Sequence, residues 1–262
     1  LVLSVVAVDL AIGLGRLAGI VSRERIRSKR FRRGRLAATL LIPVAVMTWG
    51  VTNHNTIRIK EYSIVVPRRS SPLAELTIAF ASDFHLGRIT SAGFMNRFVA
   101  KINGLKADLV LLGGDVIEGG RGSGATTTFA KDFRRIESRL GVYGVLGNHD
   151  RFGGDRGAFF EQAGIRILSE SVEKIDGAFY LAGRADGRTA RARKPIEALL
   201  EGVPDDLPLI LLDHRPTDIE NVTRTRVDVQ LSGHTHHGQL WPINFISRRQ
   251  YLLSWGHLKK GE

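Results

Sequence analysis

The sequence predicts an α/β domain preceded by a basic, apolar N-terminal region. From Leu76 onward, short apolar segments of strand character alternate with amphipathic helical segments, which is the pattern of an α/β domain. Polar residues cluster where the apolar segments end. The formal net charge of +12 is uneven, because +10 lies in residues 1–73. This imbalance separates the N-terminal region from the rest of the chain.

The N-terminal region, residues 1–52, has the pattern of a membrane anchor. Residues 1–21 are apolar apart from two charged side chains, and residues 36–51 are uncharged. Both segments are near the length of about 20 residues that crosses a bilayer. Buried or interfacial helices are the alternative. Residues 22–35 carry eight Lys or Arg and one Glu, which the positive-inside rule places on the cytoplasmic side. Everything after residue 52 would then lie on the extracytoplasmic side of a bacterial inner membrane.

Residues 53–75 are predicted to form a linker that contains one strand, over the alternating segment 56–66. The domain proper is predicted over residues 76–262. Its expected strands cover 76–82, 108–115, 141–147, 165–168, 179–182, 208–212 and 227–231. Its expected helices are one capped by Ser91, one with apolar residues at 129, 133, 136 and 140, one near 156–163 and one near 195–201.

Composition excludes several classes of function. The chain has no cysteine, which excludes disulfide scaffolds, thiolate zinc sites, iron–sulfur clusters and thiol nucleophiles. The region after residue 73 carries a net charge of only +2, so we expect no nucleic-acid partner. A GxxxxGK[ST] phosphate loop is absent from the sequence. Because the chain has no cysteine, any bound metal must be held by His, Asp, Asn or Glu.

Candidate metal ligands follow the ends of five predicted strands. The segments are SDFHLG, GGDVIEG, GNHD, LLDHRP and LSGHTHHGQ, and they contain six of the eight histidines. In extended chain, residues i and i+2 project to the same side, so Asp83 with His85, and His234 with His236, can each reach one metal region. Each motif alone also fits turn capping or a surface position. Their joint occurrence at strand ends favours a metal site.

The chemistry of this ligand set narrows the metal. Asp115 lies alone between glycines and can bridge two cations, and Asn148 adds a neutral oxygen. Imidazole, carboxylate and amide oxygen without sulfur suit Mn, Fe, Zn, Co or Ni better than Ca or Mg. The metal's identity stays open at this point.

The ordered motifs resemble those of the calcineurin-like metallophosphoesterase superfamily over about residues 76–240. The segments SDFHLG, GNHD and GHTHHGQLWP are most similar to its membrane-associated bacterial branch. The resemblance implies a four-layer αββα sandwich with two divalent metal ions at the strand ends. It assigns the first metal to Asp83, His85 and His236, the second to Asn148, His214 and His234, and the bridging position to Asp115. It also places His149 against the substrate, with Asp150 orienting and charging His149.

The resemblance implies hydrolysis of phosphodiester or phosphomonoester bonds by a hydroxide that two metals activate. A phosphorylated small molecule or lipid would be the substrate, and a membrane would be the partner surface. A pyrophosphatase of the UDP-2,3-diacylglucosamine type and a non-catalytic metal-binding scaffold are the alternatives. Relatives often have glycine at the position of His237. The His237 side chain either supports the site or lies on the exposed surface. Asp186 receives no role. Because relatives continue beyond the position of Glu262, we expect the domain to be truncated there.

Overall fold

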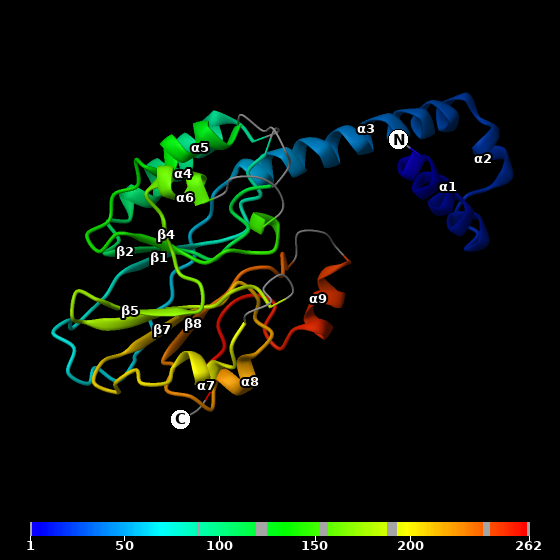
Figure 1. The fold of residues 1–262 in the computed structure, drawn as a ribbon. Coiled ribbons are helices and arrows are strands. Elements are labelled where there is room, and N and C mark those ends of the chain that lie inside the picture. The colour runs from blue at the N-terminus through cyan, green and yellow to red at the C-terminus, as the bar shows by residue number, and fades with distance from the viewer. Residues whose placement is uncertain are drawn as a thin grey trace. The chain divides into compact units, whose positions relative to one another are not determined.

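The computed structural model describes residues 2–87, 90–118, 125–151, 157–187, 193–237 and 242–260 (Figure 1). The chain divides into two compact units, Leu1–Lys60 and Glu61–Glu262. Each unit is described by itself below.

The first unit contains three helices, α1 (Val2–Leu17), α2 (Arg23–Arg27) and α3 (Lys29–Asn55). An ion pair of 2.8 Å between Arg35 and Asp9 joins α3 to α1. The 27 residues of α3 make a rod of about 40 Å, longer than the apolar core of a bilayer. Among the described residues, α3 is the one helix that is long and apolar enough to cross a membrane. The 16-residue α1 is shorter, so one of the two predicted spans meets this criterion.

The basic run 22–35 is largely helical. Ser22 and Ser28 cap the N-termini of α2 and α3, each accepting a hydrogen bond from a backbone N–H of the first turn. Residues 29–35 therefore belong to the first turns of α3, and the basic run continues along the helix rather than forming a loop.

The second unit is built on two four-stranded sheets. The first sheet has the order β1 (Ile78–Ala81), β2 (Leu109–Leu112), β3 (Val142–Gly144), β4 (Arg166–Ile167), with all pairs parallel. The second has the order β5 (Ser171–Ile175), β6 (Phe179–Gly183), β7 (Leu209–Leu212), β8 (Val229–Leu231). Only the pair of β5 and β6 in this sheet is antiparallel.

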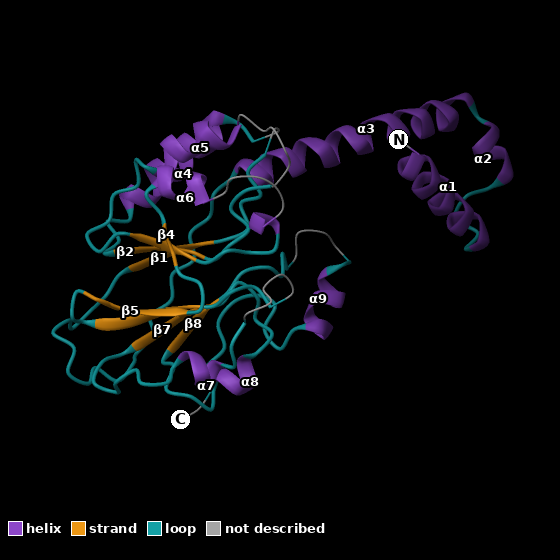
Figure 2. Cartoon of the chain, viewed as in Figure 1, coloured by secondary structure: helices purple, strands orange, loops and turns teal. Residues whose placement is uncertain are grey.

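Helices cover the outer faces of both sheets (Figure 2). The first sheet is covered by α4 (Ala92–Gly104), α5 (Ala125–Phe133) and α6 (Gly157–Ala163), and the second by α7 (Ile196–Leu199) and α8 (Ile219–Val222). A short α9 (Asn244–Gln250) follows β8 in the chain. The layers therefore run helix, sheet, sheet, helix, which confirms the predicted αββα sandwich.

Strand alternation explains the two buried layers around the second sheet. Ile210 and Leu212 of β7 pack with residues of the first sheet, such as Leu109 and Leu111, in the core between the sheets. Leu209 and Leu211 point the other way and pack with residues of α7 and α8. Because both faces of β7 are covered, its four residues are all buried and apolar.

Several elements differ from the sequence-based expectation. Residues 56–66 form no strand, because the alternating pattern there finds no pairing partner. The helix predicted to reach residue 140 ends at Phe133, before its last two apolar positions. Strand β5 was not expected, because three of its residues SVEKI are polar and they do not alternate with apolar ones; it pairs with β6 at the edge of the sheet.

Candidate metal centre

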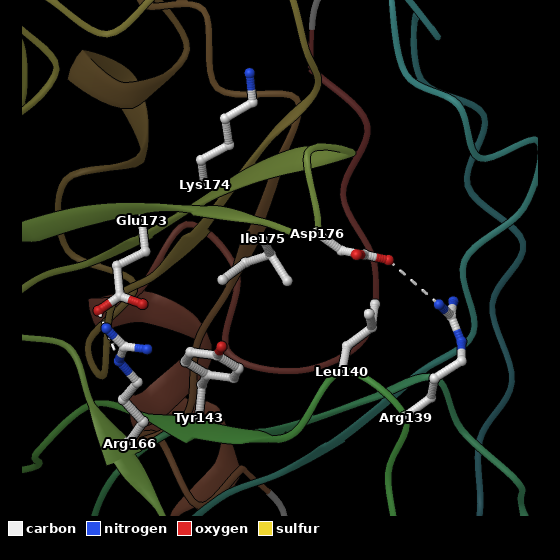
Figure 3. A pocket seen from close by; sticks show the side chains of 8 residues that line it. All are labelled: Arg139, Leu140, Tyr143, Arg166, Glu173, Lys174, Ile175 and Asp176. Carbon is white, nitrogen blue, oxygen red and sulfur yellow. Dashed lines mark hydrogen bonds and ion pairs between the residues drawn. The ribbon is translucent and has the colours of Figure 1, made fainter.

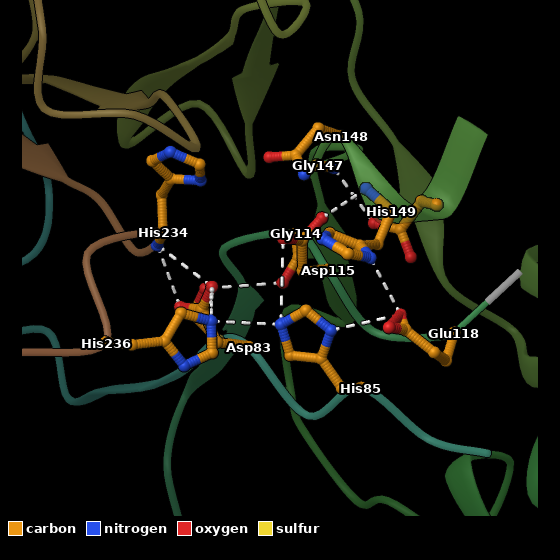
Figure 4. Close-up of polar contacts among 12 residues, drawn as sticks. Asp83, His85, Gly114, Asp115, Glu118, Gly147, Asn148, His149, His234 and His236 are labelled. Atoms are coloured by element: carbon orange, nitrogen blue, oxygen red, sulfur yellow. Dashed lines mark hydrogen bonds and ion pairs between the residues drawn. The ribbon is translucent and has the colours of Figure 1, made fainter. Parts of the chain in front are cut away.

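The candidate site lies where the carboxyl ends of strands from both sheets meet. Segments that follow β1, β2 and β3 bring the residues of the first sheet, and segments that follow β7 and β8 bring those of the second. The residues concerned are Asp83, His85, Asp115, Asn148, His149, His214, His234 and His236. Figure 4 shows most of them turned toward a common centre.

The first ligand group consists of Asp83, His85 and His236, which together offer ligand atoms within 4.8 Å of one another. The Nε2 atoms of His85 and His236 lie 3.0 Å apart (Figure 4). Asp83 Oδ1 lies 3.5 Å from Nε2 of His236. Two ring nitrogens at this distance repel each other through their lone pairs unless a proton or a cation lies between them. The arrangement therefore suits a cation.

The second ligand group consists of Asp115, His214 and His234. His214 Nδ1 lies 2.7 Å from the carbonyl oxygen of Gly113, so this nitrogen carries the proton and donates it. Nε2 of His214 is therefore the nitrogen with a free lone pair. It is buried and has no hydrogen-bond partner among the described residues, although it lies 3.2 Å from Asp115 Oδ2. A buried imidazole held by a carbonyl, with its other nitrogen unsatisfied, fits a metal ligand.

Asp115 lies between the two groups. Its Oδ2 is 3.2 Å from His214 Nε2 and 3.8 Å from His85 Nε2, and its Oδ1 accepts a hydrogen bond of 2.7 Å from the His149 backbone N–H. Burial alone would raise the pKa of Asp115, but the facing ring of His214, together with the backbone N–H and the ring of His149, outweighs it and lowers the pKa to about 2. The carboxylate is therefore ionised at neutral pH.

His234 is held in its neutral form. Burial lowers the pKa of His234 to about 4, and the charges of Arg215 and His214 act in the same direction. Neutral imidazole is the form that ligates metals. The backbone N–H of His234 donates to both carboxylate oxygens of Asp83 at 2.9 Å, which joins the β8 loop to the β1 loop.

Unusual backbone conformations gather at this site. Positive φ angles are uncommon for residues other than glycine, yet five of the candidate ligands adopt them. They are Asp83 (59°), His85 (47°), Asp115 (50°), His234 (72°) and His236 (44°). Such conformations cost of order 1–3 kcal/mol each and persist where the surrounding structure imposes them, often at functional sites.

Two glycines permit the close approach of these loops. Gly114 has a φ of 93°, and a Cβ there would lie 2.7 Å from the ring nitrogen Nδ1 of His214. A Cβ at Gly147 would overlap the Asp115 carboxylate. Glycine at both positions lets the β2 and β3 loops close around Asp115.

The amide of Asn148 is held by a residue that the sequence did not predict at the site. Its Oδ1 accepts a hydrogen bond of 2.8 Å from Nη2 of Arg215, and Nε of Arg215 donates to the carboxylate of Asp186. Both Arg215 and Asp186 are buried. From the sequence, Asp186 received no role and Arg215 was not expected at the site, although Arg215 directly follows the candidate ligand His214.

The structure does not support the expected role of Asp150. Its two carboxylate oxygens accept hydrogen bonds of 2.9–3.0 Å from the backbone N–H groups of Val116, Ile117 and Gly147. Burial raises the pKa of Asp150. The side chain turns inward and ties the β2 loop to the β3 loop, rather than contacting the His149 ring.

Glu118 takes the place that was expected for Asp150. Its Oε2 lies 2.8 Å from Nδ1 of His149 and 3.1 Å from Nδ1 of His85 (Figure 4). These three residues also form a group whose ligand atoms lie within 4.8 Å of one another. The signal for Glu118 was its position in GGDVIEG, three residues after Asp115 at the same strand end.

His237 links the site to the C-terminal segment. Its Nδ1 lies 2.8 Å from Oγ of Ser254, and the ring is partly buried. Of the two readings of His237, support of the site fits this contact better than an exposed surface position, because the neighbouring His234 and His236 belong to the ligand groups.

A cavity of about 450 Å³ lies at the opposite edge of the sheets, near the start of β3 (Figure 3). Its charged side chains pair with one another, except Lys174, which contacts Asp206 at 3.6 Å. Arg166 contacts Glu173 at 2.9 Å and Arg139 contacts Asp176 at 3.5 Å. This cavity contains none of the candidate ligands and its ion pairs are complete, so we assign it no function.

An αββα domain with imidazole and carboxylate groups gathered at the strand ends defines a metal-binding α/β domain. The family model described as calcineurin-like phosphoesterase matches residues 76–238. The chain belongs to this family of metallophosphoesterases, which implies a phosphohydrolase and the use of divalent metal.

Three relatives illustrate the breadth of the match. A transmembrane protein with metallophosphoesterase domain from Danio rerio is 30% identical, over 89% of this chain and 58% of the relative. An uncharacterized metallophosphoesterase of Helicobacter pylori is 29% identical, over 72% of this chain and 51% of the relative. A UDP-2,3-diacylglucosamine pyrophosphatase of Chlamydia trachomatis is 23% identical, over 85% of this chain and 84% of the relative.

Two further facts follow from these relatives. The chain spans about half to three-fifths of the length of the first two. The similarity to an animal protein also means that the expected restriction to a bacterial branch is not supported.

Proposed function

We propose that this protein is a metal-dependent phosphoesterase that hydrolyses phosphodiester or phosphomonoester bonds with two divalent ions drawn from Mn, Fe, Zn, Co and Ni. The observation that carries the proposal is the pair of ligand groups joined by Asp115, with the unsatisfied Nε2 of His214 in one of them. When bound, the ions would polarise phosphoryl oxygens and lower the pKa of water.

The donor atoms support one ligand set for each ion. Asp83, His85 and His236 would hold the first ion, and His214 and His234 the second, with Asp115 facing both. Asn148 would complete the second set. A carbonyl oxygen has two lone pairs, so the hydrogen bond from Arg215 leaves one of them for the ion.

His149 is the residue proposed to act on the substrate. Its side chain is 40% exposed, so a substrate can reach the ring. The carboxylate of Glu118 at Nδ1 fixes a proton on that nitrogen and leaves Nε2 to face a phosphoryl or leaving-group oxygen. When the ring is protonated on both nitrogens, Nε2 of His149 can donate its proton to the leaving oxygen or a hydrogen bond to the phosphoryl group. Glu118 would act as the positioning residue.

A lipid or lipid-linked phosphate is the proposed substrate class. An apolar helix of 27 residues and relatives named transmembrane proteins indicate membrane anchoring. The basic run 22–35 supports an extracytoplasmic domain under the positive-inside rule. We propose residues 1–52 as the anchor, 53–75 as the linker and 76–262 as the catalytic domain, which has no nucleic-acid partner. The similarity to the chlamydial enzyme favours hydrolysis of a UDP-linked diacylglucosamine as the second candidate.

The test uses the purified full chain in mild detergent, stripped of metal and reloaded with Mn²⁺. Turnover of bis-p-nitrophenyl phosphate and of p-nitrophenyl phosphate is measured together with bound metal. We expect metal-dependent turnover. Asp115→Asn should lose bound metal and more than about 100-fold in turnover, since changes outside the ligand shell already cost about 10–100-fold. His149→Ala should keep its metal and lose about 10²–10⁴-fold.

Asp176→Asn, at the opposite edge of the sheets, is the control and should behave like the parent chain. A folded chain that binds no metal would overturn the proposal. A chain that binds two metals but turns over neither compound, nor a UDP-linked diacylglucosamine, would favour the non-catalytic scaffold.

A further inference from the structure

Exposed large apolar side chains of the second unit are confined to two short segments of the described chain. The first is 62–65, and the second is 243–258, which begins just before α9. Single exposed apolar residues are ordinary on a protein surface, but a group of them marks an interaction site. The residues are Tyr62, Ile64, Val65, Ile243, Phe245, Ile246, Leu252, Trp255 and Leu258.

The two segments meet. The ring of Tyr62 lies 5.9 Å from the ring of His257. We call the group formed by residues 243–258 and the adjoining Tyr62 the C-terminal apolar surface. Its larger side chains are well exposed, with 58% for Phe245, 65% for Ile246 and 61% for Trp255.

The segment that carries most of this surface has charges of one sign, and the acidic Glu61, Asp218 and Glu220 adjoin it beside Tyr62, Tyr251 and Leu252. Residues 242–260 contain four basic residues and neither Asp nor Glu. The basic residues, all exposed, are Arg248, Arg249, Lys259 and Lys260. Aliphatic and aromatic side chains next to Arg and Lys are typical of segments that lie in the interface of an anionic bilayer. A second copy of this surface is a poor occupant, because its cations would repel these.

Chain length keeps this surface close to the proposed anchor. Tyr62 follows the last residue of α3, Asn55, by seven residues, which span at most about 25 Å when extended. If α3 crosses the membrane, Tyr62 and the segment that it contacts stay near the bilayer surface. The tether therefore supplies a high local concentration of lipid.

The C-terminal apolar surface is also attached to the metal centre. Oγ of Ser254 lies 2.8 Å from Nδ1 of His237, and the hydroxyl of Thr235 donates to the backbone carbonyl of Ser254. The ring of Tyr251 packs 6.2 Å from the ring of His234. The loop that carries His234 and His236 is thus held by the same segment that exposes the apolar side chains.

We propose that the C-terminal apolar surface docks the catalytic domain onto an anionic phospholipid bilayer, as a second membrane contact besides the helical anchor. Docking would present the metal centre to phosphate groups at the level of the lipid head groups, and this consequence rests on the proposed function. The docking itself follows from the exposed side chains, their charge and the tether.

The test uses the full chain reconstituted in vesicles, with Trp49 and Trp241 replaced by Phe so that Trp255 is the one fluorophore of its kind. Vesicles contain phosphatidylcholine alone or with phosphatidylglycerol, and a share of the acyl chains is brominated. We expect blue-shifted Trp255 emission and quenching by brominated lipid in the anionic vesicles, and a loss of both in the Arg248→Glu/Arg249→Glu variant. Circular dichroism checks the fold of each variant.

Lys101→Glu/Lys131→Glu is the matched control, because it reverses two exposed charges on α4 and α5 and should keep the quenching. Turnover of bis-p-nitrophenyl phosphate is recorded in parallel. Unquenched Trp255 with normal turnover would overturn the docking and leave the proposed function standing, whereas quenching without turnover would do the reverse. Unquenched Trp255 together with cross-linked dimers would assign the surface to a second copy, and so would also overturn the docking.

Discussion

The two edges of the sandwich differ in how their polar groups are paired. At the edge that bears the amino-terminal ends of the parallel strands, acids meet bases, as in Arg166 with Glu173, and the cavity between them is lined by completed pairs (Figure 3). At the carboxyl-terminal edge, some of the facing groups are alike. Nε2 of His85 lies 3.0 Å from Nε2 of His236 (Figure 4), and Nε2 of His214 is buried with no hydrogen-bond partner among the described residues.

The backbone shows the same difference. Asp176, at the first edge, has a φ of 49°, but it precedes Gly177 in the tight turn between β5 and β6, where positive φ angles are usual. At the second edge, five candidate ligands share this conformation without a hairpin to explain it. The cavity is therefore complete in itself, whereas the cluster of histidines leaves nitrogen lone pairs that a cation can satisfy.

Replacing one acid at each edge should give the largest difference in stability. Asp213, directly before His214, is buried and holds Arg193 with hydrogen bonds of 3.0 and 2.7 Å. Asp213→Ala leaves the largely buried Arg193, whose side chain is 15% exposed, without its acid partner and should lower the free energy of unfolding by about 3–5 kcal/mol. Asp176→Asn removes an exposed pair with a residue that tolerates the positive φ of this position, and it should cost less than about 1 kcal/mol. Thermal unfolding of the full chain in detergent measures both, and equal losses would contradict the contrast.

How far the sequence could predict this site follows from the geometry of parallel sheets. The carboxyl ends of parallel strands share one edge, so polar residues at five strand ends could be expected to meet there, and they do. Which side chain touches which depends on the loops. His149–Arg151 forms a turn that sends Asp150 inward, whereas Glu118 reaches the His149 ring. Sequence adjacency favoured Asp150, and nothing in the sequence gives the loop's path.

At the carboxyl-terminal edge, Arg215 should affect one of the two proposed metal sites and not the other. Its hydrogen bond orients the Asn148 amide, so Arg215→Gln should weaken binding of one of the two metals by about 10–100-fold, while the other metal binds as before. Arg226→Gln is the matched control, since Arg226 is a partly buried arginine that bonds Asp205 and the Leu207 carbonyl instead. Calorimetric titration with Mn²⁺ distinguishes the sites. Two unchanged affinities would show that Arg215 does not position Asn148.

The smallest expected effect lies at the amino-terminal edge and depends on pH. The backbone N–H of Thr77 donates to Asp108 at 3.0 Å and lowers the pKa of Asp108 below its ordinary 3.8; partial burial opposes this shift and Arg139 adds to it. The carboxylate therefore stabilises the fold above about pH 4, and the contribution is lost as the pH falls through the lowered pKa. Asp108→Asn should cost less than about 1 kcal/mol at pH 7.

That deficit should shrink toward zero on acidification below pH 4, since the parent carboxyl then carries a proton as well. Unfolding by urea at pH 7 and at steps below pH 4 measures the difference between the two chains. The effect should be the same with and without Mn²⁺, because Asp108 lies at the edge whose polar groups are already paired. A deficit that changed with metal would mean that the two edges are coupled, and that the contrast between them is incomplete.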